Sequence, residues 1–201
     1  MEKLKPRQLA IMQNPAKMLQ AKGPVKVTTA SLASECGITE AAIYRHSPSK
    51  RKIYEGLVDF CEQSLFDLIG DINSSKDEHL EKVSKIMILL VSFSEKNPGL
   101  ARLLTREAFS IDEASLDDRI KQMFSKIELQ IKQNLQKYEQ QTKKKLALPS
   151  ASSANLLLAF VEGVIQQFVR SGFTEKPTQR ISDQAAFLLS LIHISEPTRP
   201  Y

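Results

Sequence analysis

The chain has 201 residues, of which 28 are Lys or Arg, 23 are Asp or Glu, and 42% are hydrophobic. This composition excludes an intrinsically disordered chain, and no apolar run approaches the roughly 20 residues that cross a bilayer. We therefore expect a globular, cytoplasmic protein with no membrane partner. Glycines are few and apolar residues recur at helical spacing, which predicts an all-α fold of about nine helices.

Positive charge is concentrated at the start of the chain. Residues 1–57 carry ten Lys and Arg against four Asp and Glu, whereas residues 58–201 carry 18 against 19. A basic head on a nearly neutral body is typical of a nucleic-acid-binding segment joined to a separate scaffold. We expect one domain at 1–48 and a second at 49–189. The remaining stretch, 190–201, breaks the helical pattern and resembles the read-through of a sequencing adapter, so we expect a non-native tail.

The first half of the chain predicts five helices. One lies within residues 5–22, where Pro15 favours a shortened start. Two short helices follow at 29–36 and 39–46, a fourth begins near Ser49, and a fifth covers about 78–96. The expected apolar face of the fourth consists of Ile53, Leu57, Phe60, Leu65, Leu68 and Ile72.

Four further helices are predicted in the second half. Asn97 and Pro98 are expected to cap and begin one that runs to about 109. A long helix over about 113–146 follows, then the most apolar helix at 154–171 and a last one after Pro177. The long helix carries a narrow apolar stripe of Leu116, Ile120, Met123, Ile127, Ile131, Leu135 and Tyr138.

Residues 28–46 satisfy the steric demands of a helix-turn-helix. Ala33 is small where the two helices cross, and Gly37 tolerates the positive φ of the turn. Ile38 and Ile43 can anchor the second helix to the core. Such a motif presents the start of its second helix to the major groove of DNA.

The residue types of this motif suit contacts with DNA. Thr39 and Arg45 can bond to base edges, and Ala41 lets the backbone approach them. Glu40 either caps its own helix or accepts from a cytosine amine. The candidate DNA-binding residues are Thr28, Thr29, Thr39, Glu40, Ala41, Tyr44, Arg45, His46 and Lys50.

Three of these candidates have alternative explanations. Tyr44 could instead pack between helices, and His46 could be a structural hydrogen-bond donor. Lys50 lies near a helix N-terminus, where free backbone N–H groups and positive charge favour phosphate, although a solvated charge run is the plain alternative.

No pattern of catalytic residues is present in the sequence, so we expect neither an enzyme nor a metal or cofactor site. Cys36 and Cys61 lie in predicted helices and are expected to be buried free thiols. His79 lies among charged residues, which favours a solvated face over a metal ligand.

The stretch ITEAAIYRHSPSK, residues 38–50, resembles the signature Tyr-x-His-Phe-x-x-Lys of TetR-type regulators. Within that family the closest resemblance is to nucleoid occlusion factors. It continues through SEKNPGLARLLT (94–105) and LLAFVEGVIQQFVRSGF (157–173), and it covers roughly residues 20–189.

The resemblance implies a three-helix DNA-binding head and a C-terminal helical dimerisation domain. Such proteins are nucleoid-associated homodimers that bind palindromic sites on double-stranded DNA. When bound, they engage the C-terminal tail of the division GTPase FtsZ and antagonise assembly of the FtsZ ring.

The resemblance also assigns sites. The groove for the FtsZ tail lies between the fourth and fifth helices, although Phe60 and Leu89 could equally be ordinary core. The helix at 154–171, together with the long seventh helix, is expected to form the dimer interface. The implied groove residues are Phe60, Leu89, Ser92, Lys96 and Asn97.

Three residues depart from the family pattern. Ser47 replaces the signature Phe, Pro15 interrupts the first helix, and Leu68 stands where a basic groove residue is usual. A small-molecule-responsive TetR-type repressor is the alternative function, and it would need a cavity with convergent polar groups.

Overall fold

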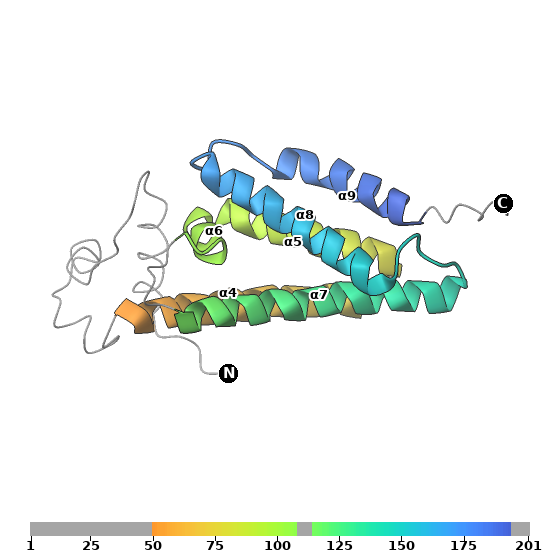
Figure 1. Ribbon diagram of the computed structural model, residues 1–201, viewed down its shortest axis with the longest axis horizontal. Helices are drawn as coiled ribbons and strands as arrows, with labels where there is room; N and C mark the ends of the chain where they lie inside the picture. Colours follow the sequence, from red (N-terminus) through yellow and green to blue (C-terminus); the bar gives the residue numbers. More distant parts are fainter. Residues whose placement is uncertain (1–49, 108–113, 194–201) are drawn as a thin grey trace. The chain divides into compact units, whose positions relative to one another are not determined.

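The computed structural model describes residues 50–107 and 114–193. The three helices predicted before residue 49, and with them the helix-turn-helix, lie outside these residues. The described part is entirely helical, which confirms the all-α class there (Figure 1). Its helices are α4 (Lys50–Ser74), α5 (His79–Lys96), α6 (Pro98–Leu104), α7 (Ala114–Thr142), α8 (Ser150–Arg170) and α9 (Thr178–His193).

The chain divides into two compact units. The first comprises residues 1–64 and 96–121, and the second comprises residues 65–95 and 122–201. In the first unit, α7 is tied to the start of α4 by Arg119, whose Nη2 donates to Asp59 at 2.6 Å and to Glu62 at 3.1 Å.

The buried face of α4 differs from the predicted one. Ile53, Leu57 and Leu65 are buried as expected, but Phe60 is 38% exposed and Leu68 is 43% exposed. The buried stripe advances from Leu57 in steps of four residues, and such steps drift around an α-helix by about 40° each. Phe60 and Leu68 fall outside that drifting stripe. Tyr54, Val58, Cys61 and Ile69 are buried in addition.

The predicted apolar stripe of α7 is confirmed. All of its members are at most 6% exposed, and in the second unit Met123, Ile127 and Ile131 are fully buried. Spacing of three and four residues keeps such side chains on one side of a helix, so the sequence alone was sufficient to predict the buried face of α7.

α8 and α9 form an antiparallel hairpin in the second unit (Figure 1). Gly172 and Phe173 both adopt φ 65° in the connection, and the Phe173 N–H donates to the Phe168 carbonyl at 3.1 Å. The two rings then meet edge to face with centroids 5.3 Å apart. The Thr178 N–H donates to the Glu95 carboxylate at 2.9 Å, which places negative charge at the N-terminus of α9.

Three predicted helix boundaries were wrong. α6 ends at Leu104, before the expected 109. α7 ends at Thr142, before the expected 146, and the next residue, Lys143, leaves the helical conformation with φ 59°. α8 begins at Ser150 and so includes polar residues ahead of its apolar run.

α9 extends into the stretch predicted as a non-native tail. It ends at His193, and Ile192 is only 4% exposed. The Ile192 carbonyl accepts from the Ala147 N–H at 2.9 Å, which joins the end of α9 to the segment before α8. Residues 190–193 therefore belong to the helix in this structure.

α8 is also long and apolar enough, by length and composition, to cross a membrane. Half of its most apolar window is buried inside the protein, and core helices of soluble proteins pass the same test. The pattern is therefore weak evidence for a membrane span.

A polar network lies within the second unit, around Asn134 of α7, which is only 4% exposed. The Asn134 amide donates to Asn73 Oδ1 at 2.8 Å and to the Gln130 carbonyl at 3.0 Å. Its Oδ1 is therefore the acceptor for the His79 Nδ1–H at 3.0 Å. Lys82, also buried, donates to the Asn73 carbonyl at 3.0 Å. The network fixes the ends of α4 and α5 against α7.

Replacing Asn134 with Ala should destabilise the protein. The substitution leaves His79 Nδ1 and Asn73 Oδ1 without a hydrogen-bond partner at half-buried positions, and such losses cost about 1–3 kcal/mol. Urea denaturation followed by circular dichroism, at one fixed protein concentration, measures the change. Gln136→Ala, at an exposed position on the same helix, is the control and should change the unfolding free energy by less than about 0.5 kcal/mol. Equal effects of the two variants would contradict a structural role for the network.

Candidate functional site

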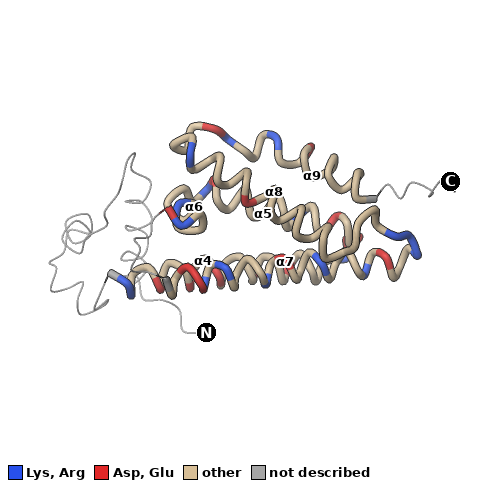
Figure 2. Tube along the Cα trace, viewed as in Figure 1, with Lys and Arg blue, Asp and Glu red and all other residues tan. Residues whose placement is uncertain are grey.

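The predicted DNA-binding residues Thr28, Thr29, Thr39, Glu40, Ala41, Tyr44, Arg45 and His46 lie outside the described residues. Lys50 is the first residue of α4. The next two residues, Arg51 and Lys52, are basic and strongly exposed, with side-chain exposures of 61% and 59%. Figure 2 shows this basic start of α4 directly after the undescribed segment.

Glu55 organises the two exposed cations. Lys52 Nζ lies 2.6 Å from one carboxylate oxygen of Glu55, and Arg51 Nε lies 3.0 Å from the other. The hydrogen bond from Lys52, followed by that from Arg51, holds the pKa of Glu55 below its usual value. The carboxylate therefore holds both exposed cations together at the start of α4.

The predicted residues of the partner groove belong to both compact units. Phe60 is partly exposed on α4, and Asn97 begins the first turn of α6, where its carbonyl accepts from the Ala101 N–H at 2.9 Å. Leu89 and Ser92 are half-buried on α5, and Lys96, its last residue, is exposed. Each is solvent-accessible, as a binding residue must be. The groove as a whole stays a prediction.

In the second unit, Leu89 and Ser92 lie on a stripe of α5 that begins with Lys85. Lys85 Nζ lies 2.6 Å from Asp77 and 2.8 Å from Glu81. These contacts, that with Asp77 first, raise the pKa of Lys85. Lys85 is thus held as a paired cation, and the stripe continues with one apolar side chain, Leu89, and one hydroxyl, Ser92.

Other candidate chemistry is weak in the described residues. They hold no group of three or more His, Cys, Asp or Glu that could bind a metal ion. Burial raises the pKa of the Cys61 thiol to about 12, so the cysteine is a buried free thiol, as expected, and unreactive. His79 was expected on a solvated face, but it is half-buried and bonded to Asn134, so that expectation was wrong.

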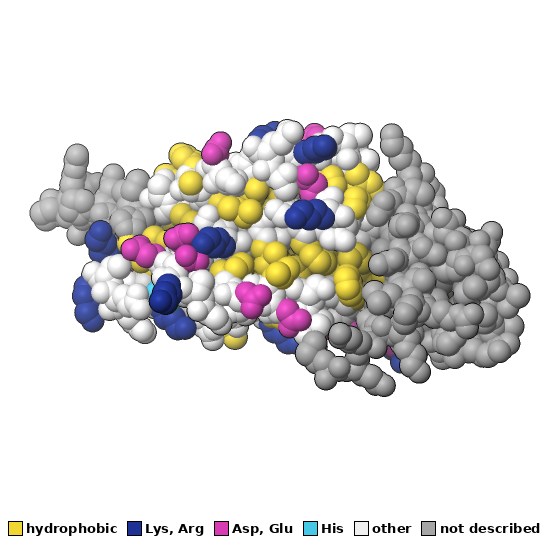
Figure 3. Space-filling model, turned by 180° about the vertical axis from the view of Figure 1, so that it is seen from behind, with side chains coloured by type: hydrophobic (Ala, Val, Ile, Leu, Met, Phe, Trp, Pro, Cys, Tyr) yellow, Lys and Arg dark blue, Asp and Glu magenta, His cyan; other side chains and the backbone are white. Residues whose placement is uncertain are grey.

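The outward face of the α8–α9 hairpin carries large apolar side chains. Leu156 of α8 is 45% exposed, and Phe187 and Leu191 of α9 are 63% and 46% exposed. Gly163 lies between the polar and apolar parts of the exposed side of α8, and a Cβ added there would meet nothing within 4 Å. On the face drawn in Figure 3, hydrophobic side chains of described residues likewise reach the surface between interspersed charges.

Comparisons with known proteins identify the family. A model of SlmA-like proteins, described as the tetracyclin repressor-like C-terminal domain, matches residues 77–193. A model of bacterial regulatory proteins of the tetR family matches residues 11–57. Nucleoid occlusion factor SlmA of Shewanella oneidensis is 43% identical over 178 residues, which is 89% of this chain and 90% of that protein. The chain belongs to the SlmA family. This confirms the resemblance carried by residues 38–50.

A second SlmA relative and two solved structures extend the comparison. SlmA of Colwellia psychrerythraea is 41% identical over 188 residues, or 93% of this chain and 95% of that protein. The fatty acid degradation regulator FadR from Bacillus halodurans superposes with TM-score 0.79 at 15% identity, covering 94% and 97% of the two chains. A putative TetR-family regulator from Rhodococcus sp. gives TM-score 0.76 at 14% identity, covering 94% and 100%.

The structural neighbours show that the fold is TetR-like. The chain is a DNA-binding regulator of the SlmA family, so the prediction that it is not an enzyme is confirmed. The tetR-family match spans both Pro15 and Ser47, so these departures do not remove the head from the family.

The pairing at the start of α4 can be tested by titration. Replacing Lys52 with Gln should raise the pKa of Glu55 toward its usual value, because the strongest hydrogen bond to the carboxylate is lost. Arg51→Gln should raise it less. Carbon-detected NMR of the Glu55 carboxyl across pH 2–7 measures both shifts. Lys126→Gln, at a lysine in the other unit, is the control; an unchanged Glu55 titration in all three variants would refute the pairing.

Proposed function

We propose that the protein is a nucleoid occlusion factor that, when bound to palindromic chromosomal sites as a homodimer, binds the FtsZ C-terminal tail and antagonises FtsZ-ring assembly. The observation that carries this proposal is the 41–43% identity to SlmA proteins over about nine-tenths of the chain. The protein would accordingly act in the cytoplasm, on the nucleoid.

The charge distribution supports binding of the head to DNA. The excess of Lys and Arg falls within residues 1–57, and the described end of that segment presents Arg51 and Lys52 to solvent. Phosphate contacts by such residues supply most non-specific affinity, whereas the start of the recognition helix supplies sequence preference.

The accessible stripe of α5 supports a peptide partner. Leu89 and Ser92 are half-buried, and Lys96 follows one helical turn later and is exposed. An apolar side chain, Leu89, followed on the same helix by the Lys96 cation suits a short tail that carries apolar side chains and a carboxylate. We assign Phe60, Leu89, Ser92, Lys96 and Asn97 to the tail site on this chemistry and on the family resemblance.

The exposed apolar residues support a homodimer formed by α8 together with α9. The sequence suggested α8 with α7, but the exposed positions of α7 in the second unit are polar except for Leu129, which is 47% exposed. Phe187 and Leu191 make α9 the better second helix. Packed helical hairpins of this kind bury apolar faces in symmetric bundles.

The cavity between α8 and α9 gives little support to the alternative function, that of a small-molecule-responsive repressor. Its volume of about 50 Å³ is far below the 300–1,000 Å³ usual for ligand pockets.

DNA-binding measurements on two variants should distinguish a residue that contacts bases from one that contacts phosphates. Arg45→Ala should relax sequence preference, with the affinity for the specific site falling by about 1–3 kcal/mol relative to random DNA. Lys50→Ala should weaken all sequences alike and reduce the slope of log K against log salt by about one. Fluorescence anisotropy over a salt series measures both. Identical profiles for the two variants would refute the assignment of roles.

Partner binding is tested with the FtsZ tail peptide in the presence and absence of operator DNA. The wild-type protein should bind the peptide, and Lys96→Glu should abolish binding by repelling the peptide carboxylate while leaving DNA binding intact. Lys121→Glu, another exposed lysine, is the control. Isothermal titration calorimetry measures affinity. If the wild-type protein binds no peptide in either state, the division-inhibitor proposal fails although the DNA-binding function stands.

A further inference from the structure

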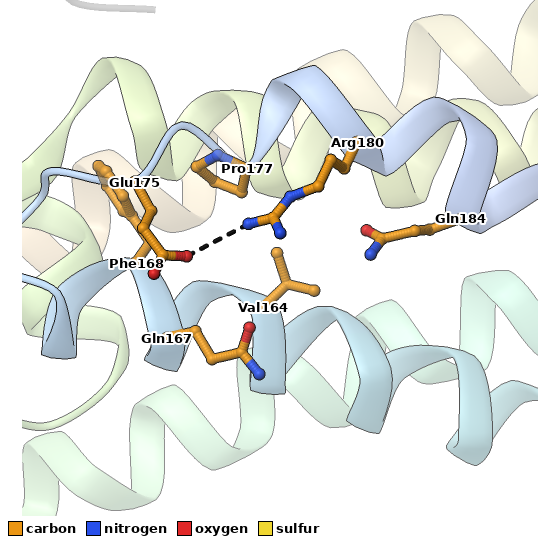
Figure 4. A pocket seen from close by; sticks show the side chains of 7 residues that line it. All are labelled: Val164, Gln167, Phe168, Glu175, Pro177, Arg180 and Gln184. Atoms are coloured by element: carbon orange, nitrogen blue, oxygen red, sulfur yellow. Dashed lines mark hydrogen bonds and ion pairs between the residues drawn. The ribbon is translucent and has the colours of Figure 1, made fainter.

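A small pocket lies at the loop end of the α8–α9 hairpin, within the second unit (Figure 4). Its floor is apolar and is formed by Val164, Phe168 and Pro177. Its rim is polar, with one carboxylate, one guanidinium and two amides. The rim residues are Gln167, Glu175, Arg180 and Gln184.

Arg180 and Glu175 form an ion pair across the rim. Arg180 Nη2 lies 3.2 Å from Glu175 Oε2, and the two side chains are 63% and 55% exposed (Figure 4). An exposed pair of this kind contributes little to the stability of a single chain. It leaves an acid and a base on the surface beside each other, and both remain accessible to a partner.

The polar rim is one end of a longer surface patch, here called the seam, which consists of one row of residues on α8 and one row on α9. On α8, Leu156, Ala159, Gly163 and Gln167 are exposed at steps of three and four residues, so they lie on one side of the helix. On α9, Arg180, Gln184, Phe187 and Leu191 repeat the same spacing. Because the two helices are antiparallel, both polar ends lie at the connecting loop and both apolar ends lie away from it.

This seam is chemically complementary to itself. A two-fold interface brings the same patch of two copies together, so a patch with a single sign of charge would repel its copy. Here the loop end holds one acid and one base, and the Gln167 and Gln184 amides each donate and accept. Apolar side chains match apolar ones if the two hairpins pair with their loop ends together.

We infer that Glu175 and Arg180 are the specificity clamp of the homodimer, and that Arg180 of each copy pairs with the carboxylate at position 175 of the other. The inference rests on the proposed dimerisation through α8 and α9. The clamp excludes related chains whose charges at these positions do not match, because like charges facing each other across an interface are strongly unfavourable.

The test exchanges the two charges. The double variant Glu175→Arg with Arg180→Glu keeps an ion pair inside each copy and between two identical copies, so it should form homodimers like the wild type. A mixture of wild type and double variant brings arginine against arginine and glutamate against glutamate. Mixed dimers should then fall from the statistical half to below about a tenth of all dimers. Native mass spectrometry of mass-tagged chains counts the three species.

Controls separate the clamp from the dimer itself. Differently tagged wild-type chains, and wild type mixed with Leu129→Glu, should give mixed dimers at about half. Phe187→Glu should yield monomers if the α8–α9 face is the interface. If wild type and double variant still form mixed dimers at about half, the clamp is overturned although the wild-type homodimer stands. The same holds if the double variant is folded but monomeric. A monomeric wild type would overturn the proposed homodimer as well.

Discussion

One amide that is buried beside an apolar stripe, that of Asn134, constrains how α4, α5 and α7 pack in the second unit. Asn134 lies beside the stripe of α7 and is only 4% exposed, so each of its polar atoms needs a partner. Asn73 and His79 supply those partners from the two helix ends that meet there. A shift of either helix by one residue would leave several buried groups unpaired, whereas aliphatic residues alone would tolerate small slips. The network therefore fixes the register that positions the accessible stripe of α5.

The α8–α9 hairpin has an inner side that is buried in the core and an outer side that is exposed to solvent. Its inner side chains, such as Leu157 and Val161, are fully buried. Its outer side combines an apolar end around Phe187 with a polar end around Arg180. In the proposed homodimer, a copy of the same chain covers the exposed apolar end, and no new surface chemistry is needed. Half of the most apolar window of α8 is buried in a single chain, as in core helices of soluble proteins.

The sequence predicted elements where one physical signal dominated and failed where several competed. The stripe of α7 was predictable because apolar residues spaced by three and four positions leave one choice of buried face. On α4, apolar residues occur on several sides, and only packing decides that Tyr54 and Ile69 are buried while Phe60 is not. Asn134 gave no signal because polar residues are usually exposed, and its partners lie more than fifty positions away. The end of α7 at Thr142 depended on a positive φ at a lysine, which lysine does not favour.

The candidate sites also include residues that the sequence indicated and residues that it could not indicate. Lys96 was assigned by family resemblance, and its exposure is compatible with that role, although exposure alone would not have selected it. The pair of Glu175 and Arg180 could not be recognised from the sequence, because it joins a loop to the first turn of α9 and depends on how the connection after Gly172 folds.

The start of α4 and the loop end of the α8–α9 hairpin differ in their balance of charge. At the start of α4, one carboxylate holds two cations, and the excess of positive charge favours a polyanion. At the end of the hairpin, one acid and one base balance, which favours a copy of the same surface. The near neutrality of residues 58–201 keeps the body from competing for DNA with the basic head. In the proposed homodimer, the same near neutrality avoids long-range repulsion between the two bodies, and short-range matching of charges would then select the partner.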